Sequence, residues 1–189
     1  MSINRICIKI LVTMSERYQT GPASKPEREP ECFFCEQLLE QKDGVVTETE
    51  SWRVLVSRDQ GYLGRCMVIP KRHIDRKEEL LEEEVLELHY LQVDLENAVS
   101  QTLGARMCNW TQLGNHAYRE VDPKPHLHYH MRPRYAEAVE FQGRRFEDPA
   151  FGEMYDLDQR WNVDADPEAA GFKEEVATAL RAYFNESEQ

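Results

Sequence analysis

A short run of the chain, residues 125–134, carries three histidines at strict two-residue spacing. His126, His128 and His130 alternate with the apolar side chains of Leu127, Tyr129 and Met131. Successive side chains of a β-strand point to opposite faces, so the run predicts a strand with imidazoles on one face and apolar groups on the other. Such a strand has to lie between a hydrophobic core and a polar site. We therefore expect a functional site built on a sheet.

Length and charge limit what that site binds. The 189 residues, 41% of them hydrophobic, suit one domain with a substantial core. The net charge of -12 argues against general binding of nucleic acid or of an anionic membrane, because both need clustered Lys and Arg. Any anionic ligand must be met by local cations, of which Arg132 and Arg134 directly follow the histidines. We find no apolar stretch of membrane-spanning length, and we expect a soluble protein.

The remaining pattern predicts an α+β fold with a mainly antiparallel five-stranded sheet. β-branched runs at 45–49 and 52–56 predict a hairpin, and residues 65–70 predict a third, buried strand. Apolar positions at three- and four-residue steps over 75–103 predict one long amphipathic helix, ended by Gly104. Strands four and five are predicted at residues 105–112 and 127–132, and a further strand at 138–146. The periodicity from Phe172 to Tyr183 predicts a C-terminal helix.

Composition also suggests a division of the chain. The segment before Cys32 is rich in Pro, Glu, Lys and Ser, so residues 1–31 are expected to be a flexible leader. Residues 32–135 hold the motifs and are expected to form the catalytic domain. Residues 136–189 are expected to be a C-terminal extension that packs on this domain or on a partner subunit.

Two of the five cysteines form the pair Cys32-Phe-Phe-Cys35. An odd cysteine total without a secretory signal favours a reducing, cytoplasmic setting, in which such a pair binds metal or does redox work. Zinc prefers tetrahedral sulfur and nitrogen ligands, and His73 and His126 would complete a Cys2His2 set with the two thiols. A site with four protein ligands has no open position for water, so this zinc would be structural. A redox pair is the competing interpretation.

If His126 binds zinc, His128 and His130 remain on the polar face beside Asn109, Asn115 and Arg132. Imidazole attacks phosphorus directly and gives a phosphoramidate, which splits one hard displacement into two easier ones. A neighbouring histidine donates a hydrogen bond or a proton toward the phosphate. No Walker motif or Asp-rich cluster accompanies these residues, which argues against a magnesium-dependent kinase or polymerase. A cupin-like metal site formed by all three histidines is an alternative, but it leaves Cys32 and Cys35 unexplained.

The run from His126 to Arg134 resembles the histidine-triad motif of HIT proteins, in which alternating hydrophobic residues separate three histidines. The stretch Val68-Ile-Pro-Lys-Arg-His73 before a long helix, Asn109 on the preceding strand and the Cys32/Cys35 pair support the resemblance, which spans residues 32–135. It implies an antiparallel half-barrel, usually a homodimer, and a nucleotide hydrolase or transferase that acts at an α-phosphate.

The resemblance also implies individual roles. His128 matches the nucleophile that forms a covalent nucleotidyl-histidine, His130 the histidine that contacts the phosphate, and Asn109 an active-site amide. Zinc-binding members would use Cys32, Cys35, His73 and His126.

The chain departs from the family pattern in three places, one of which is the Gly-rich loop that leads to the triad and is replaced here by residues 110–115. Gly64-Arg65 stands where many members carry Gly-His, and the ribose-binding acid or amide falls near Ser57 and Asp59. The related galactose-1-phosphate uridylyltransferases replace the third histidine by Gln, so His130 argues against that activity.

The leading hypothesis is therefore a zinc-stabilised hydrolase, which we favour over a nucleotidyl transferase. Its substrate would be a nucleotide conjugate such as a dinucleoside polyphosphate or a nucleoside phosphoramidate. The alternative is a nucleotide-binding or regulatory module that keeps the pocket with weak catalysis.

Overall fold

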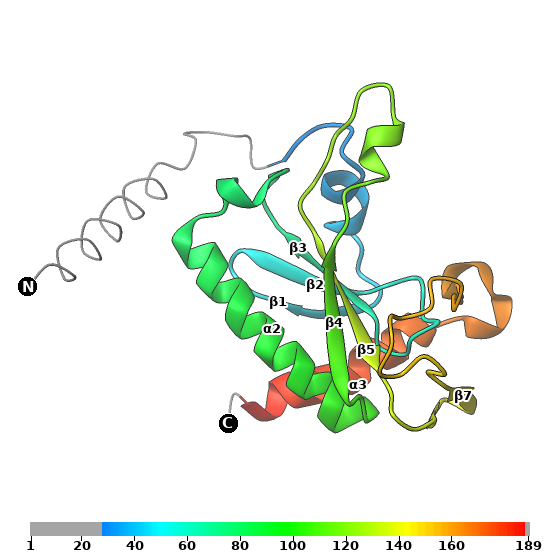
Figure 1. Cartoon of the computed structure of the whole chain (residues 1–189). Coiled ribbons are helices and arrows are strands. Elements are labelled where there is room, and N and C mark those ends of the chain that lie inside the picture. Colours follow the sequence, from blue (N-terminus) through cyan, green and yellow to red (C-terminus); the bar gives the residue numbers. More distant parts are fainter. Residues whose placement is uncertain (1–27, 188–189) are drawn as a thin grey trace, which may run out of the picture.

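The computed structural model describes residues 28–187, and its centre is a five-stranded antiparallel sheet (Figure 1). The strand order is β1-β2-β3-β5-β4, so the chain leaves β3, returns at the edge as β4 and then enters the sheet as β5. This confirms the predicted α+β fold with its open antiparallel sheet. The strands are β1 (Val45–Glu48), β2 (Trp52–Val56), β3 (Cys66–Pro70), β4 (Met107–Gln112) and β5 (Tyr129–Arg134).

Two helices, α2 (Glu82–Leu103) and α3 (Phe172–Ser187), contact each other and share one core with the strands. Val54, Val68 and Met131 from the sheet and Leu95 and Val176 from the helices are all fully buried in this core. Because both helices cover the same face, the other face is left for the site. No helix in the described part of the chain is long and apolar enough to cross a membrane.

Short helical turns connect these elements. They are the π-helix Phe34–Leu38 and the 3-10 helices Lys77–Glu79, Ala117–Arg119, Val163–Ala165 and Pro167–Ala169.

The long helix begins at Glu82 and not at residue 75 as the periodicity indicated. Leu80 and Leu81 are extended, and the Leu81 N–H donates to the Glu84 carboxylate over 2.8 Å. Glu84 and the Glu79 backbone carbonyl both accept from the guanidinium of Arg72. The Glu84 and Arg72 side chains thus bind the backbone N–H of Leu81 and the carbonyl of Glu79, which a longer helix would have paired within itself. The helix therefore starts only at Glu82. Its end agrees with expectation, because Gly104 adopts a φ of 77°.

The region 138–146 forms a hairpin and not one strand. Its strands are β6 (Val139–Phe141) and β7 (Arg144–Phe146), which pair antiparallel. Gln142 and Gly143 between them have φ angles of 51° and 72°. Two consecutive positive φ values give the type of two-residue turn that matches strand twist, and the single expected strand is divided there. The strand predicted at 52–56 has the observed bounds of β2, and the other predicted strands differ from the observed ones by one or two residues at their ends.

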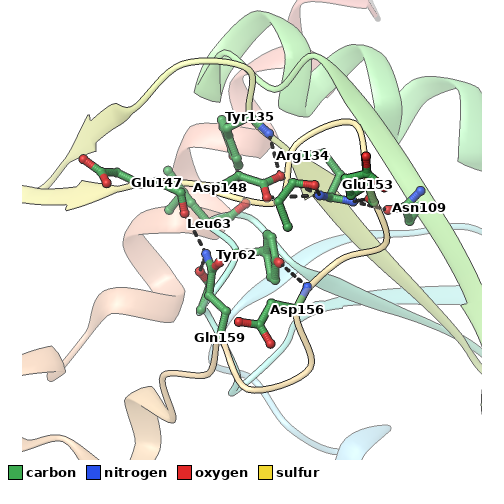
Figure 2. Close-up of polar contacts among 12 residues, drawn as sticks. Tyr62, Leu63, Asn109, Arg134, Tyr135, Glu147, Asp148, Glu153, Asp156 and Gln159 are labelled. Atoms are coloured by element: carbon green, nitrogen blue, oxygen red, sulfur yellow. Dashed lines mark hydrogen bonds and ion pairs between the residues drawn. The ribbon is translucent and has the colours of Figure 1, made fainter.

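The residues after β5 pack along one end of the sheet around a buried arginine (Figure 2). The Arg134 guanidinium forms a two-point ion pair with Asp148, and both side chains are almost fully buried. It also donates to the backbone carbonyls of Ala150 and Glu153, over 2.6 and 3.1 Å. Arg134 therefore anchors the segment that follows β7.

A second set of contacts fastens this segment to the loop between β2 and β3. The Asp156 N–H donates to the Tyr62 hydroxyl over 2.8 Å, and the Gln159 amide donates to the Gly61 carbonyl over 2.9 Å (Figure 2). A Cβ on Gly61 would lie 2.2 Å from the Gln159 carbonyl oxygen. The close approach of the two backbones therefore requires glycine there. The leader expected over 1–31 lies mostly outside the described residues.

Asp148→Asn should destabilise the protein by about 3 kcal/mol, because it leaves the buried Arg134 cation without its counter-charge. Chemical denaturation followed by circular dichroism measures this difference. The control is Glu147→Gln, since Glu147 pairs with Arg145 in an exposed ion pair, and it should change stability by less than about 0.5 kcal/mol. Equal effects of the two variants would contradict the anchoring role of Asp148.

Candidate functional site

Four side chains from three distant segments meet in a buried cluster of possible metal ligands. Cys35 lies in the π-helical turn and Cys32 just before it, His73 lies in the loop after β3, and His126 lies in the segment that enters β5. One ligand atom of each lies within 4.8 Å of the others. In the region 28–187 it is the only group of three or more His, Cys, Asp or Glu residues whose ligand atoms lie close enough together to hold a metal ion.

The distances in this cluster fit zinc. Cys32 Sγ and Cys35 Sγ each lie 3.5 Å from His126 Nδ1, and Cys35 Sγ lies 3.5 Å from His73 Nδ1. In a tetrahedral zinc site, bonds of about 2.3 Å to sulfur and about 2.0 Å to nitrogen separate the two atoms by about 3.5 Å. Cys32, Cys35, His73 and His126 therefore form a closed Cys2His2 site of the structural zinc type.

His126 is oriented for metal binding by its second ring nitrogen. Nε2 lies 3.0 Å from the Pro70 carbonyl oxygen and donates to it, which leaves the lone pair on Nδ1 facing the sulfurs. Burial lowers the pKa of His126 to about 4, so the ring is neutral at physiological pH. A metal-binding imidazole needs this form.

The redox interpretation of the cysteine pair agrees less well with the structure. A redox-active cysteine has a lowered pKa in a partly exposed, electropositive setting. Cys35 is buried, and burial raises the pKa of its thiol to about 11. A bound cation offsets this cost by taking both sulfurs as thiolates.

His128 and His130 lie beside the cluster on the same face of the sheet, and their rings meet edge to face at 5.0 Å. Leu127, Tyr129 and Met131 are buried in the core on the opposite face, as the alternation predicted. β5 itself begins only at Tyr129, so His126 and His128 stand in the extended segment before it.

Hydrogen bonding and burial fix the form of these two imidazoles. His128 Nδ1 lies 2.8 Å from the His126 carbonyl oxygen and donates to it, so Nε2 carries the lone pair. Burial lowers the pKa values of both rings, and the positive charges of Arg65 and Arg132 lower that of His130 further, to about 3. Both rings are therefore neutral at pH 7, and one of them presents an unprotonated nitrogen.

Apolar side chains continue this face of the sheet away from the histidines. In the strand register Thr111 pairs with His130, His130 with Met67, and Met67 with Leu55, so all four share one face. Leu55 belongs to a small second core with Leu39 and Ile69, against which Phe34 packs. The Phe34 ring stacks on His128 with centroids 4.3 Å apart. The site thus joins neutral imidazoles to an apolar surface.

The predicted substrate-binding residues are not all brought together. Asn109 on β4 pairs in register with Arg132, and its carbonyl oxygen accepts from Arg134 over 3.0 Å. Asn115 is exposed in the loop after β4, away from these contacts. Ser57 and Asp59 stabilise the turn after β2: the Ser57 hydroxyl accepts from the Asp59 N–H, and the Asp59 carboxylate pairs with Arg65 and accepts from the Trp161 N–H over 3.2 Å.

Four residues that the sequence did not single out also face the site. Phe34 stacks on His128, and Tyr155 from the C-terminal segment stacks on Arg132. Arg65 and His116 lie close enough to disfavour the protonated form of His130. A pattern of spacing contains no signal for these contacts, because each depends on how loops fold back over the sheet.

Comparisons with known proteins agree with this geometry. The HIT domain model matches residues 39–137. Comparison with curated proteins found no match.

Among solved structures, a zinc-bound histidine triad family protein from Mycobacterium smegmatis shares 20% identity over 84% of this chain and 96% of its own, with a TM-score of 0.57. A hypothetical histidine triad nucleotide-binding protein from Sulfolobus tokodaii strain 7 shares 18% identity over 82% of this chain and 93% of its own, with a TM-score of 0.58. A uridylyltransferase shares 18% identity over 96% of this chain and 51% of its own, with a TM-score of 0.53.

At these identities the structural likeness shows a shared fold. The domain match itself covers more than half of the chain and includes all three histidines. On this basis, the chain belongs to the HIT family.

Proposed function

We propose that this protein is a nucleotide hydrolase or nucleotidyl transferase that cleaves a nucleotide conjugate at its α-phosphate, with hydrolysis as the principal reaction. The observation that carries the proposal is the hydrogen bond from His128 Nδ1 to the His126 carbonyl, which fixes the lone pair on Nε2. Candidate substrates are dinucleoside polyphosphates and nucleoside phosphoramidates. The alternative is a nucleotide-binding module with weak catalysis, which would bind nucleotide without forming a covalent adduct.

In the first step, His128 Nε2 attacks the α-phosphorus, a P–N bond forms and the bond from phosphorus to the leaving group breaks. The leaving group departs with the bonding electron pair and takes up a proton. In the second step, water attacks the same phosphorus and releases a proton to solvent, which balances the proton taken up by the leaving group. The P–N bond breaks and the imidazole regains its lone pair. Neutral His128 is available for the first step because burial lowers its pKa.

His130 and the arginines support the phosphate in this mechanism. His130 is adjacent to His128 and faces the same side of the sheet, so we assign it a hydrogen bond to a phosphate oxygen. Arg132 supplies positive charge, and the Asn109 amide retains a free N–H2 group to donate. Candidates for nucleoside contacts are Asn115, Ser57 and Asp59. The Asp59 carboxylate already pairs with Arg65, so a nucleoside would have to share it.

We assign one structural zinc ion per chain to Cys32, Cys35, His73 and His126. The ion supplies no step of the reaction, because four protein ligands leave no open coordination position. These residues tie the π-helical turn, and with it Phe34, to the histidine segment.

His128→Ala should abolish turnover because it removes the proposed nucleophile. It should leave the fold intact because the hydrophobic core lies on the opposite face of the sheet. The measurement is hydrolysis of diadenosine tetraphosphate, together with trapping of an acid-labile adduct from labelled nucleotide. His89→Ala is the control, since His89 is exposed on α2, and it should retain activity and adduct. Full activity of a clean His128→Ala preparation would reject the mechanism, and nucleotide binding without an adduct in the wild type would favour the binding module.

Cys32→Ser should lower the zinc content by about one ion per chain and reduce thermal stability, because metal binding contributes to folding. Metal analysis of purified protein measures the content. Cys108→Ser is the matched control, since Cys108 lies on β4 outside the cluster, and it should keep its zinc. Equal metal contents in the two variants would remove Cys32 from the site.

The family resemblance also predicts a homodimer, and one surface supports this. Val85, Leu86, Tyr90 and Val93 expose apolar side chains along α2, and β4 is an edge strand with unpaired backbone groups on one side. We propose that a second copy of the chain covers this surface.

Val93→Glu should therefore shift the protein toward the monomer, as measured by light scattering after gel filtration. Leu157→Glu introduces the same charge at an exposed apolar residue of the C-terminal segment and should leave the dimer intact. A monomeric wild type would reject the proposed interface.

A further inference from the structure

Arg132 is a buried cation that has no counter-ion among the residues that the structure describes. Its side chain lies on β5 two residues after His130, and the residue is only 4% exposed. Nε and Nη1 are fully buried and have no hydrogen-bond partner among the described residues. Burial of a charge without partners costs several kcal/mol, so this arrangement indicates a place where an anion is received.

The neighbouring arginines show that the chain can neutralise such charges. Arg134 pairs with Asp148 and Arg65 with Asp59. Arg132 forms no ion pair within residues 28–187 and has instead the Tyr155 ring, 3.7 Å from its Cζ. The three arginines thus have only two carboxylate partners, Asp59 and Asp148, and Arg132 is the one left unpaired. The aromatic face orients the guanidinium but leaves its N–H groups unused.

The strand register places this positive charge next to the catalytic histidines. Cys66 pairs with Met131 and Met67 with His130, so Arg65 and Arg132 are neighbours at the start of β3 on the same face as His130. The positive charges of both arginines lower the pKa of His130, as expected for groups this close. Two further buried atoms, Arg65 Nε and Thr111 Oγ1, have no hydrogen-bond partner within the described part of the chain, and Thr111 lies directly opposite His130.

We propose that Arg132, together with Arg65, forms a second anion subsite that binds a phosphate of the leaving group. The inference rests on the proposed function and adds a substrate class: nucleotide conjugates in which a further phosphate follows the scissile α-phosphate. His128 attack breaks the bond between the α-phosphorus and the bridging oxygen. The departing phosphate carries the electron pair and the developing negative charge, which the two guanidinium groups stabilise. Conjugates whose leaving group lacks a phosphate cannot use this subsite.

The kinetic test is the ratio of kcat/KM for diadenosine tetraphosphate to kcat/KM for adenosine 5′-phosphoramidate. Arg132→Met removes the guanidinium and keeps an unbranched apolar stem, and it should lower this ratio about tenfold or more, the usual effect of losing a charged hydrogen bond. Arg145→Met is the control at an exposed arginine of the same C-terminal region, and it should leave the ratio unchanged. An unchanged ratio in Arg132→Met would overturn the proposal.

A binding test separates the subsite from the reaction. Inorganic pyrophosphate should raise the Tm of the full-length wild type and of His128→Ala, and Arg132→Met should lose this shift while Arg132→Lys retains part of it. If Arg132→Met does not fold, Arg65→Met takes its place in both tests. An equal pyrophosphate shift in wild type and variants overturns the subsite even if hydrolysis is confirmed. A shift in wild type that the arginine variants lose supports it even if no substrate is cleaved.

Discussion

The structure depends on the alternation of side chains along one extended segment. From His126 to Arg132, every second residue points into the core beneath α2 and the others point to the site. A shift of one residue would expose Leu127, Tyr129 and Met131 and bury the imidazoles among apolar groups, so the register is strongly determined. Because β5 lies inside the sheet, with β3 and β4 as neighbours, the same register also fixes which residues of those strands face the histidines.

Within that frame the three histidines have different environments. His126 turns its Nδ1 toward two sulfurs, whereas His128 turns the equivalent nitrogen to a backbone carbonyl. His130 makes neither contact and lies among positive side chains. Identical side chains at equal spacing thus differ in what lies opposite each ring, and this difference is the basis on which we assign His126 to the metal and propose His128 as the nucleophile. The cupin-like alternative requires all three to converge on one ion, and these orientations do not.

Sequence patterns predicted the sheet, α2, α3 and the Cys2His2 group, because each rests on periodicity or on the small set of residues that bind zinc. They placed the start of α2 too early, since the competition of Glu79 and Glu84 for local donors is invisible to apolar spacing. They also could not show that Arg134 is neutralised while Arg132 is not. Both follow the histidines, and the difference comes from Asp148, which the chain brings back from beyond the β6-β7 hairpin.

Phe34 lies between the two cysteines of the metal cluster and stacks on His128, so one aromatic ring belongs to two sites. The position of this ring is set by a turn that the metal closes, and the ring in turn limits the rotamers open to the imidazole. An ion held by four protein ligands therefore still lowers the conformational entropy of the His128 side chain. In such an arrangement, a metal that is usually described as structural contributes to preorganisation, and its loss would first appear as disorder of this neighbouring imidazole.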